Sequence, residues 1–141
     1  MGAEFCTMSE KIKELYDCEY VTSDEALYPL QEWYNTLIDK TMDDITIADV
    51  LRMIRQKMFI KLAMQKAVEI LQRNVFAGEL YDGQLLDKIS EIDSEFFEID
   101  TEKLKLVVKD ALDKSEAYEW SYDGEKEEFI EIVKLLAKKI A

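Results

Sequence analysis

Carboxylates are the side chains whose type and spacing could do chemistry in this chain. Five of them fall close together, at Asp93, Glu95, Glu98, Asp100 and Glu102. Such a run could hold calcium or magnesium, or supply a pair of groups for acid–base catalysis. It lacks the Asp-x-Asp-x-Asp-Gly order of a calcium-binding EF-hand loop, and no glycine lies between Gly83 and Gly124. We therefore expect a solvated acidic surface here and assign no metal ligand.

The remaining reactive groups are absent or wrongly placed. The chain has no histidine, which removes the commonest general base and the commonest neutral metal ligand. Serine–histidine and cysteine–histidine nucleophile systems are thereby excluded. Cys6 and Cys18 are the only cysteines, too few for a disulfide framework and wrongly spaced for a zinc site. We expect no catalytic residue and no cofactor; an enzyme that uses carboxylates and a metal alone stays open as an alternative.

The charge of the chain favours a basic protein partner. Its 141 residues carry a formal net charge of −13, and the stretch from Glu91 to Glu131 holds fifteen acidic residues against five lysines. This much negative charge repels phosphate backbones, so nucleic-acid binding is disfavoured. No apolar run approaches the roughly 18–20 residues of a membrane span, and the first residues show no charged and apolar pattern of a secretory signal. We therefore predict a cytoplasmic protein with no membrane partner.

The length and the 48% of hydrophobic residues fit one domain with a buried core. Residues 1–7 show no helical pattern, and Met8 resembles a natural start. We expect residues 1–7 to be vector-encoded or disordered, and residues 8–141 to form a single domain.

The elements that must position the acidic residues are helices. Apolar residues recur at i, i+3, i+4 and i+7, the spacing of one buried helical face. Thr46 is placed to cap one helix with Asp49 as the capping-box acid, and Pro29 suits the first turn of another. The pattern predicts an all-α bundle of six to seven antiparallel helices, with one continuous helix from Gln84 through Phe96. The predicted helical segments are 9–16, 29–40, 47–58, 60–71, 84–99, 101–112 and 125–140.

Several apolar positions are expected in the core on spacing alone. They are Leu51, Ile54, Leu71, Leu85, Leu86, Leu104, Val107, Val108, Ala111 and Leu112. The segment from Glu116 to Gly124 carries three aromatic residues and is expected to be a loop.

The central part of the chain resembles a known family. It carries Arg-x-x-Arg-Gln from Arg52 to Gln56, Ala-x-x-x-Leu from Ala67 to Leu71, and Tyr-Asp-Gly-x-Leu-Leu from Tyr81 to Leu86. In this order and spacing, the blocks resemble the immunity proteins of contact-dependent growth inhibition systems. The chain departs from the family pattern at Gln65, where a proline is expected nearby, and at Gln84, where aspartate is usual. We assign a structural role to the motif residues Arg52, Gln56, Tyr81, Asp82, Gly83, Leu85 and Leu86.

The resemblance implies a partner and a function. Immunity proteins bind a cognate toxin tightly, commonly over its active site, and many such toxins are nucleases with basic clefts. An acidic surface would then replace the nucleic acid and accelerate encounter. We hypothesise that this surface binds the C-terminal domain of the toxin, and that the acids share it with aromatic anchors. The hypothesised toxin-binding residues are Glu91, Asp93, Glu95, Glu98, Asp100, Tyr118, Trp120 and Tyr122.

Structural interpretations of these residues, and an alternative function, stay open beside this hypothesis. Runs of charge are usually solvated faces, and the three aromatic residues would serve equally well to cover the core. The alternative function is a general helical interaction or regulatory module without a toxin partner.

Overall fold

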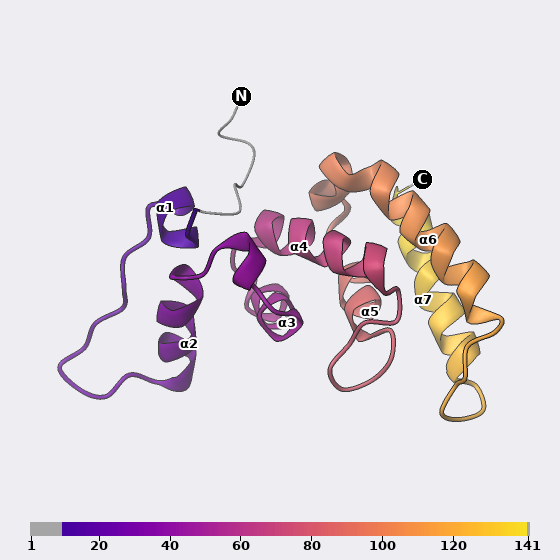
Figure 1. The fold of residues 1–141 in the computed structure, drawn as a ribbon, viewed down its shortest axis with the longest axis horizontal. Helices are drawn as coiled ribbons and strands as arrows, with labels where there is room; N and C mark the ends of the chain where they lie inside the picture. Colours follow the sequence, from indigo (N-terminus) through magenta and orange to yellow (C-terminus); the bar gives the residue numbers. More distant parts are fainter. Residues whose placement is uncertain (1–9, 141) are drawn as a thin grey trace. The chain divides into compact units, whose positions relative to one another are not determined.

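The computed structural model describes residues 10–140, and for residues 98–100 it describes the backbone alone. Over this part of the chain the regular structure consists of seven α-helices and two 3₁₀ segments, with one isolated bridge between Lys11 and Thr41 and no β-strand (Figure 1). The all-α prediction is confirmed. Residues 1–7, expected to be vector-encoded or disordered, lie outside the described residues. The chain divides into two compact units, residues 1–49 and 50–141.

The first unit is built on α1 (Ile12–Tyr16), α2 (Pro29–Ile38) and the 3₁₀ segment η2 (Met42–Asp44). Proline occupies the first turn of α2, as predicted, because its missing N–H costs no helical hydrogen bond there. The amide of Ile12 donates to the carbonyl of Lys40 at 2.9 Å, which fixes α1 to the end of α2. The buried apolar residues of this unit are Ile12, Leu37, Ile38, Met42 and Ile45.

The predicted capping box starts α3 (Ile47–Gln56). The amide of Asp49 donates to the Thr46 hydroxyl at 3.2 Å, and the amide of Thr46 donates to the Asp49 carboxylate at 3.0 Å. Lys40 Nζ, at 2.6 Å, and Trp33 Nε1, at 3.1 Å, bind the same carboxylate. Burial alone would raise the pKa of Asp49, but the hydrogen bonds from Lys40, Thr46 and Trp33 lower it overall. The residue is therefore both a helix cap and the polar centre of the first unit.

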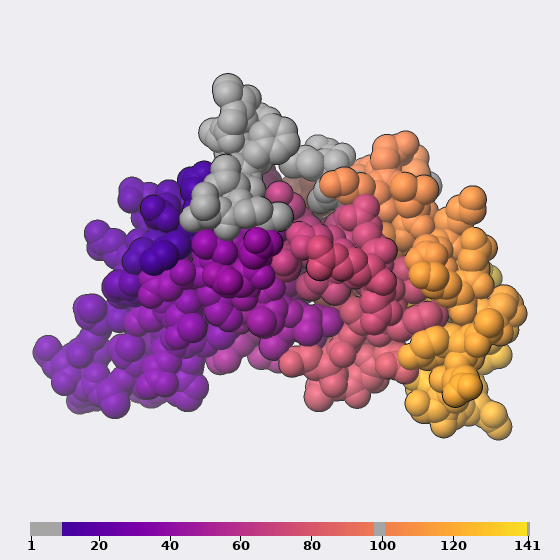
Figure 2. Space-filling view, viewed as in Figure 1, coloured from indigo at the N-terminus to yellow at the C-terminus, as the bar shows by residue number. Residues whose placement is uncertain are grey.

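The second unit contains α4 (Ile60–Arg73), α5 (Gln84–Ser90), η3 (Ser94–Asp100), α6 (Thr101–Ser115) and α7 (Glu125–Ile140). The loop from 116 to 124 returns the chain so that α6 and α7 run antiparallel side by side, and α7 also packs on α5 (Figure 1). Side chains of α6 and α7, drawn in orange to yellow, close the space between the two ribbons (Figure 2). Fully buried residues of this unit include Leu62, Leu71, Leu85, Leu86, Ile89, Phe97, Leu104, Ala111, Val133 and Leu136.

Four sequence predictions, on helix continuity and on burial, are wrong. The expected continuous helix from Gln84 through Phe96 is two pieces, α5 and η3, because Asp93 leaves the helical conformation between them, at φ −58° and ψ 137°. Leu112 is 37% exposed, since the inward face of α6 passes through Leu104, Val107, Ala111 and Ser115. Ile54 and Val108 are half-buried rather than buried. Ile54 lines a groove.

Candidate functional site

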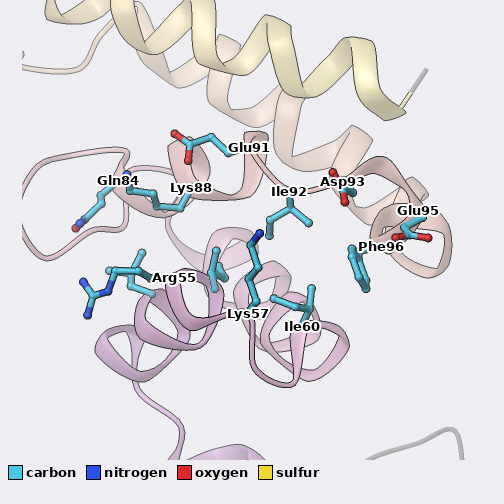
Figure 3. Close-up of a pocket in the computed structure, with 12 residues that line it drawn as sticks. Arg55, Lys57, Ile60, Gln84, Lys88, Glu91, Ile92, Asp93, Glu95 and Phe96 are labelled. Carbon is cyan, nitrogen blue, oxygen red and sulfur yellow. The ribbon is translucent and has the colours of Figure 1, made fainter. Parts of the chain in front are cut away.

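A groove of about 620 Å³ lies on the second unit, between the α3–α4 turn on one side and α5 with η3 on the other (Figure 3). This volume is in the range of pockets that hold ligands or several side chains of a partner. Its lining residues are Leu51, Ile54, Arg55, Lys57, Ile60, Gln84, Lys88, Glu91, Ile92, Asp93, Glu95 and Phe96.

The floor of the groove is apolar and incompletely covered. Leu51 and Ile92 are 9% and 8% exposed, so their side chains belong to the core beneath it. Ile54, Ile60 and Phe96 are half-buried and present apolar surface to the groove. Apolar surface of this kind gains free energy when a partner removes it from water.

The charges around the floor differ between its two ends, and Glu91 lies on the same side as Lys88 in the view of Figure 3. Arg55 and Lys88 lie at one end of the groove, whereas Asp93 and Glu95 lie at the other (Figure 3). Lys57 reaches into the middle, beside Ile92 in the view of Figure 3. Among the described side chains, neither these five ionic groups nor Glu91 form an ion pair. Opposite charges are therefore present at the groove without neutralising one another.

Local backbone geometry places the basic side of the groove. Helix α3 ends with Lys57 in the left-handed region, at φ 56°, and the amide of Met58 donates to the carbonyl of Met53 at 2.9 Å. Glycine is the usual residue at such a helix end, and a lysine there costs about 1 kcal/mol. Phe59, at φ 49°, is also left-handed. The turn thus holds two unfavourable conformations where it borders the groove.

The acidic side depends on a contact from the C-terminal helix. Lys139 on α7 donates from Nζ to the carbonyls of Ser90, at 2.5 Å, and Ile92, at 3.1 Å. In a continuing α-helix these carbonyls would accept from the amides four residues further on. The lysine therefore satisfies the carbonyls at the point where α5 stops, and the chain leads from there into Asp93 and Glu95.

The predicted acidic residues border this groove where the structure describes them. Glu91, Asp93 and Glu95 are exposed and line it. The side chains of Glu98 and Asp100 lie outside the described residues, although their backbone forms the end of η3.

The predicted aromatic residues lie elsewhere. They occupy the 116–124 loop, at the opposite end of α6 from η3 (Figure 1), and a helix of that length spans about 22 Å. Tyr118 stacks on Phe76 with ring centroids 3.8 Å apart, and Trp120 packs against Phe76 and Phe129. Tyr122 is 55% exposed. The structure therefore does not bring the aromatic residues together with the acidic ones.

The Tyr-Asp-Gly motif forms the tight turn that starts α5. Gly83 takes φ +85°, and a Cβ there would lie 2.7 Å from Cδ1 of Phe129. Gln84, the departure from the family pattern, accepts hydrogen bonds from the amides of Glu79 and Leu80 at 2.7 and 2.9 Å. Its carbonyl oxygen has two lone pairs and can satisfy both donors. Gly83 and Gln84 thus both stabilise the turn.

The other motif residues differ in burial. Leu85 and Leu86 are fully buried, Arg52 is half-buried on α3, and Gln56 is exposed at the end of that helix. The hydroxyl of Tyr81 donates to the carboxylate of Asp87 at 2.5 Å, so the residue buttresses the helix that follows it.

A second cleft, of about 420 Å³, lies beside this turn. Its lining combines acids and tyrosines over Phe129 and Ile132. The hydroxyl of Tyr118 donates to Asp82 at 2.6 Å. That hydrogen bond, with burial and the nearby negative charge, raises the pKa of Tyr118 to about 12. Burial and the nearby carboxylates also raise the pKa values of Tyr81 and Tyr122, which line the cleft. Its polar lining residues are Tyr81, Asp82, Asp87, Tyr122, Glu125 and Glu128.

Sequence reasoning missed the basic and apolar half of the groove. From the sequence, Arg55 is assigned no part in a site and Ile54 is placed in the core. A usable signal was present, because the stretch from Asp44 to Arg73 is the basic part of an otherwise acidic chain. Nothing in the sequence placed that stretch opposite Asp93 and Glu95.

Two features are absent from the described residues. Among them, no three cysteine or acidic side chains come together in a way that could hold a metal ion. Within the same residues, no helix combines the length and the apolar character needed to cross a bilayer.

The fold and groove define a class of protein: a helical, strongly acidic chain with an apolar groove. The charges at this groove make no ion pair with a described side chain. Exposed apolar grooves of this kind are typical of surfaces that bind other proteins. Comparison with known families makes the assignment more specific. A family model of CDI immunity proteins matches residues 14–107, more than half of the chain, and the chain belongs to this family. No curated protein matches the chain.

Proposed function

We propose that this chain neutralises a cognate toxin by binding its C-terminal domain in a stoichiometric complex, and that it does so without catalysing a reaction. The observation that carries the proposal is the match to the CDI immunity proteins across residues 14–107. We place the complex in the cytoplasm, because an immunity protein must meet a delivered toxin where it acts.

The charge of the chain supports a basic toxin surface as the partner. Glu91, Asp93 and Glu95 are exposed at the groove and make no ion pair with a described side chain, so their charge is available to a partner. A nuclease has a basic cleft for phosphates, and an acidic protein is a competitor for that cleft. We therefore favour a nuclease as the toxin.

The proposed toxin-binding residues form two groups that need separate tests. The acidic group is Glu91, Asp93, Glu95, Glu98 and Asp100. The aromatic group is Tyr118, Trp120 and Tyr122, of which Trp120 also packs against Phe129. Substitution of Trp120 would lower stability as well as affinity, so Tyr122→Ala is the informative change in that group.

Co-expression tests the function itself. The C-terminal domain of the exported protein encoded next to this gene is induced in bacteria with and without the chain, and growth and co-purification are measured. Rescue of growth with a one-to-one complex is expected. Continued toxicity, or rescue without a complex, would refute neutralisation by binding and favour the alternative of a general helical interaction module.

Charge reversal tests the acidic group. Affinity for the inactivated toxin domain is measured for each acid-to-lysine variant at about 0.1 M and about 1 M salt, where the screening length falls from about 10 Å to about 3 Å. Weaker binding at low salt, with a smaller difference at high salt, is expected. Unchanged affinity in all five variants would remove this group from the interface.

A further inference from the structure

We propose that the groove binds one segment of the toxin in a fixed direction, with an acidic side chain of that segment at Arg55 and Lys88 and a basic side chain at Asp93 and Glu95. An apolar side chain of the same segment covers the floor between them. This inference rests on the proposed function, and it names the site and the chemistry of the segment that the site accepts.

The floor supplies the first argument. Ile54, Ile60 and Phe96 leave apolar surface open in a hollow whose walls come from four elements. An apolar side chain that enters the hollow removes its own surface and that of the floor from water, which is the arrangement of a binding hot spot. The buried Leu51 and Ile92 beneath it keep the floor rigid.

The separation of charge supplies the second argument. A uniformly acidic groove would accept any basic segment in either direction. Here Arg55 and Lys88 outnumber Glu91 at one end, whereas Asp93 and Glu95 lie at the other (Figure 3). The net charges of the two ends are therefore opposite. A segment with matching charges gains attraction at both ends, and the reversed segment meets a net like charge at both. Complementarity of this kind fixes register and rejects wrong partners more than it adds affinity.

The backbone supplies the third argument. The left-handed conformation of Lys57 is unfavourable, and a glycine in its place would remove both that cost and the side chain. In Figure 3 this side chain points toward Ile92 across the groove. Unfavourable backbone conformations that persist are commonly found where a site needs a side chain in a given place.

A charge-inverted variant tests the proposal while the net charge of the protein stays at −13. Long-range steering depends on that net charge, so the variant isolates the direction of charge in the groove. It carries Arg55→Glu, Lys88→Glu, Asp93→Lys and Glu95→Lys.

A matched control carries four substitutions at exposed positions on α6 and α7, also with no change in net charge. It carries Lys109→Glu, Asp113→Lys, Glu131→Lys and Lys134→Glu. Thermal unfolding of both variants, compared with the original chain, establishes that each is folded before binding is measured.

Affinity for the inactivated toxin domain is then measured for all three chains. We expect the inverted variant to bind roughly 100-fold or more weakly, and the control to bind within about threefold of the original. An inverted variant that binds as tightly as the control would overturn the proposed direction and site, although the toxin would still be bound. Failure of the original chain to bind or neutralise the domain would instead refute the proposed function.

A second variant tests the apolar floor independently of charge. Phe96→Ala truncates a half-buried side chain at the acidic end of the groove. We expect affinity to fall about 10-fold, with a smaller dependence on salt than for the charge variants. Unchanged affinity in this variant would contradict the insertion of an apolar side chain.

Discussion

Replacement of Gly83 by alanine should destabilise the second unit more than replacement of Gly124, although both glycines have positive φ. Their φ values are +85° and +95°, so an alanine at either position costs about 1–2 kcal/mol of backbone energy. A Cβ at Gly124 meets nothing within 4 Å, whereas one at Gly83 lies 2.7 and 2.9 Å from two ring carbons of Phe129. The comparison therefore isolates the cost of the close contact.

The ring of Phe129 has little room to move away. It is 3% exposed and packs against Phe76 and Trp120, each with a centroid separation of 5.2 Å. Forcing an extra carbon into such a core typically costs about 1–3 kcal/mol. We therefore expect a loss of about 2–5 kcal/mol in the free energy of unfolding for Gly83→Ala, against about 1–2 kcal/mol for Gly124→Ala.

Urea unfolding measures this difference. The chain has two tryptophans, so in a Trp33→Phe background the fluorescence reports Trp120, which lies against Phe129. Both variants should keep the m-value of the background protein, since the surface exposed on unfolding is the same. Equal losses in the two variants, within about 0.5 kcal/mol, would refute the close contact between Gly83 and the ring.

Three further predictions concern single side chains. Asp49→Asn should lower the free energy of unfolding at pH 7 by about 1–3 kcal/mol, because it weakens the hydrogen bond from Lys40. Since the folded-state pKa of Asp49 is lowered, this contribution is present above about pH 4 and lost as the pH falls through the folded pKa. Urea unfolding between pH 7 and 3 should therefore show the difference between the two proteins shrinking, and a constant difference would contradict the ion pair. Asp82→Asn should return the pKa of Tyr118 from about 12 toward about 10, which ultraviolet titration follows with Tyr118→Phe as the control. Because the folded-state pKa of Tyr118 is raised, the stabilisation from its hydrogen bond is present below about pH 10 and lost as the pH rises through about 12. A Tyr118 titration that Asp82→Asn leaves unchanged would refute the hydrogen bond. Lys57→Gly should raise the free energy of unfolding by up to about 1 kcal/mol, measured by thermal unfolding. The same change should weaken toxin binding, measured by titration with the toxin domain. A fall in stability would contradict the cost assigned to the left-handed conformation of Lys57.

The local signals in the sequence were reliable where a few neighbouring residues decide the structure. The Thr46–Asp49 capping box and the proline at the start of α2 each depend on contacts within one helical turn, and both predictions are confirmed. The motif assigned Gly83 a structural role. Its close contact with the ring of Phe129 could not be predicted, because Phe129 lies far along the chain.

The sequence pattern predicts the wrong buried residues where two apolar faces of one segment overlap. In α6, Val107 and Val108 permit two neighbouring faces, and packing against α7 selects the one that buries Val107 and leaves Leu112 exposed. In the segment after α5, both Phe96 and Phe97 continue an apolar pattern. The core takes Phe97, which is 1% exposed.

The sequence by itself determined the helical class, the excess of negative charge, the absence of histidine chemistry and the family resemblance that the comparison confirmed. Periodicity and composition suffice for these properties because each is local or additive. Only the tertiary structure decided that α5 stops where Lys139 reaches its last carbonyls, and that Arg55 and Lys88 lie across an apolar floor from Asp93 and Glu95. These features depend on contacts between residues far apart in the chain, which no spacing within one helix records.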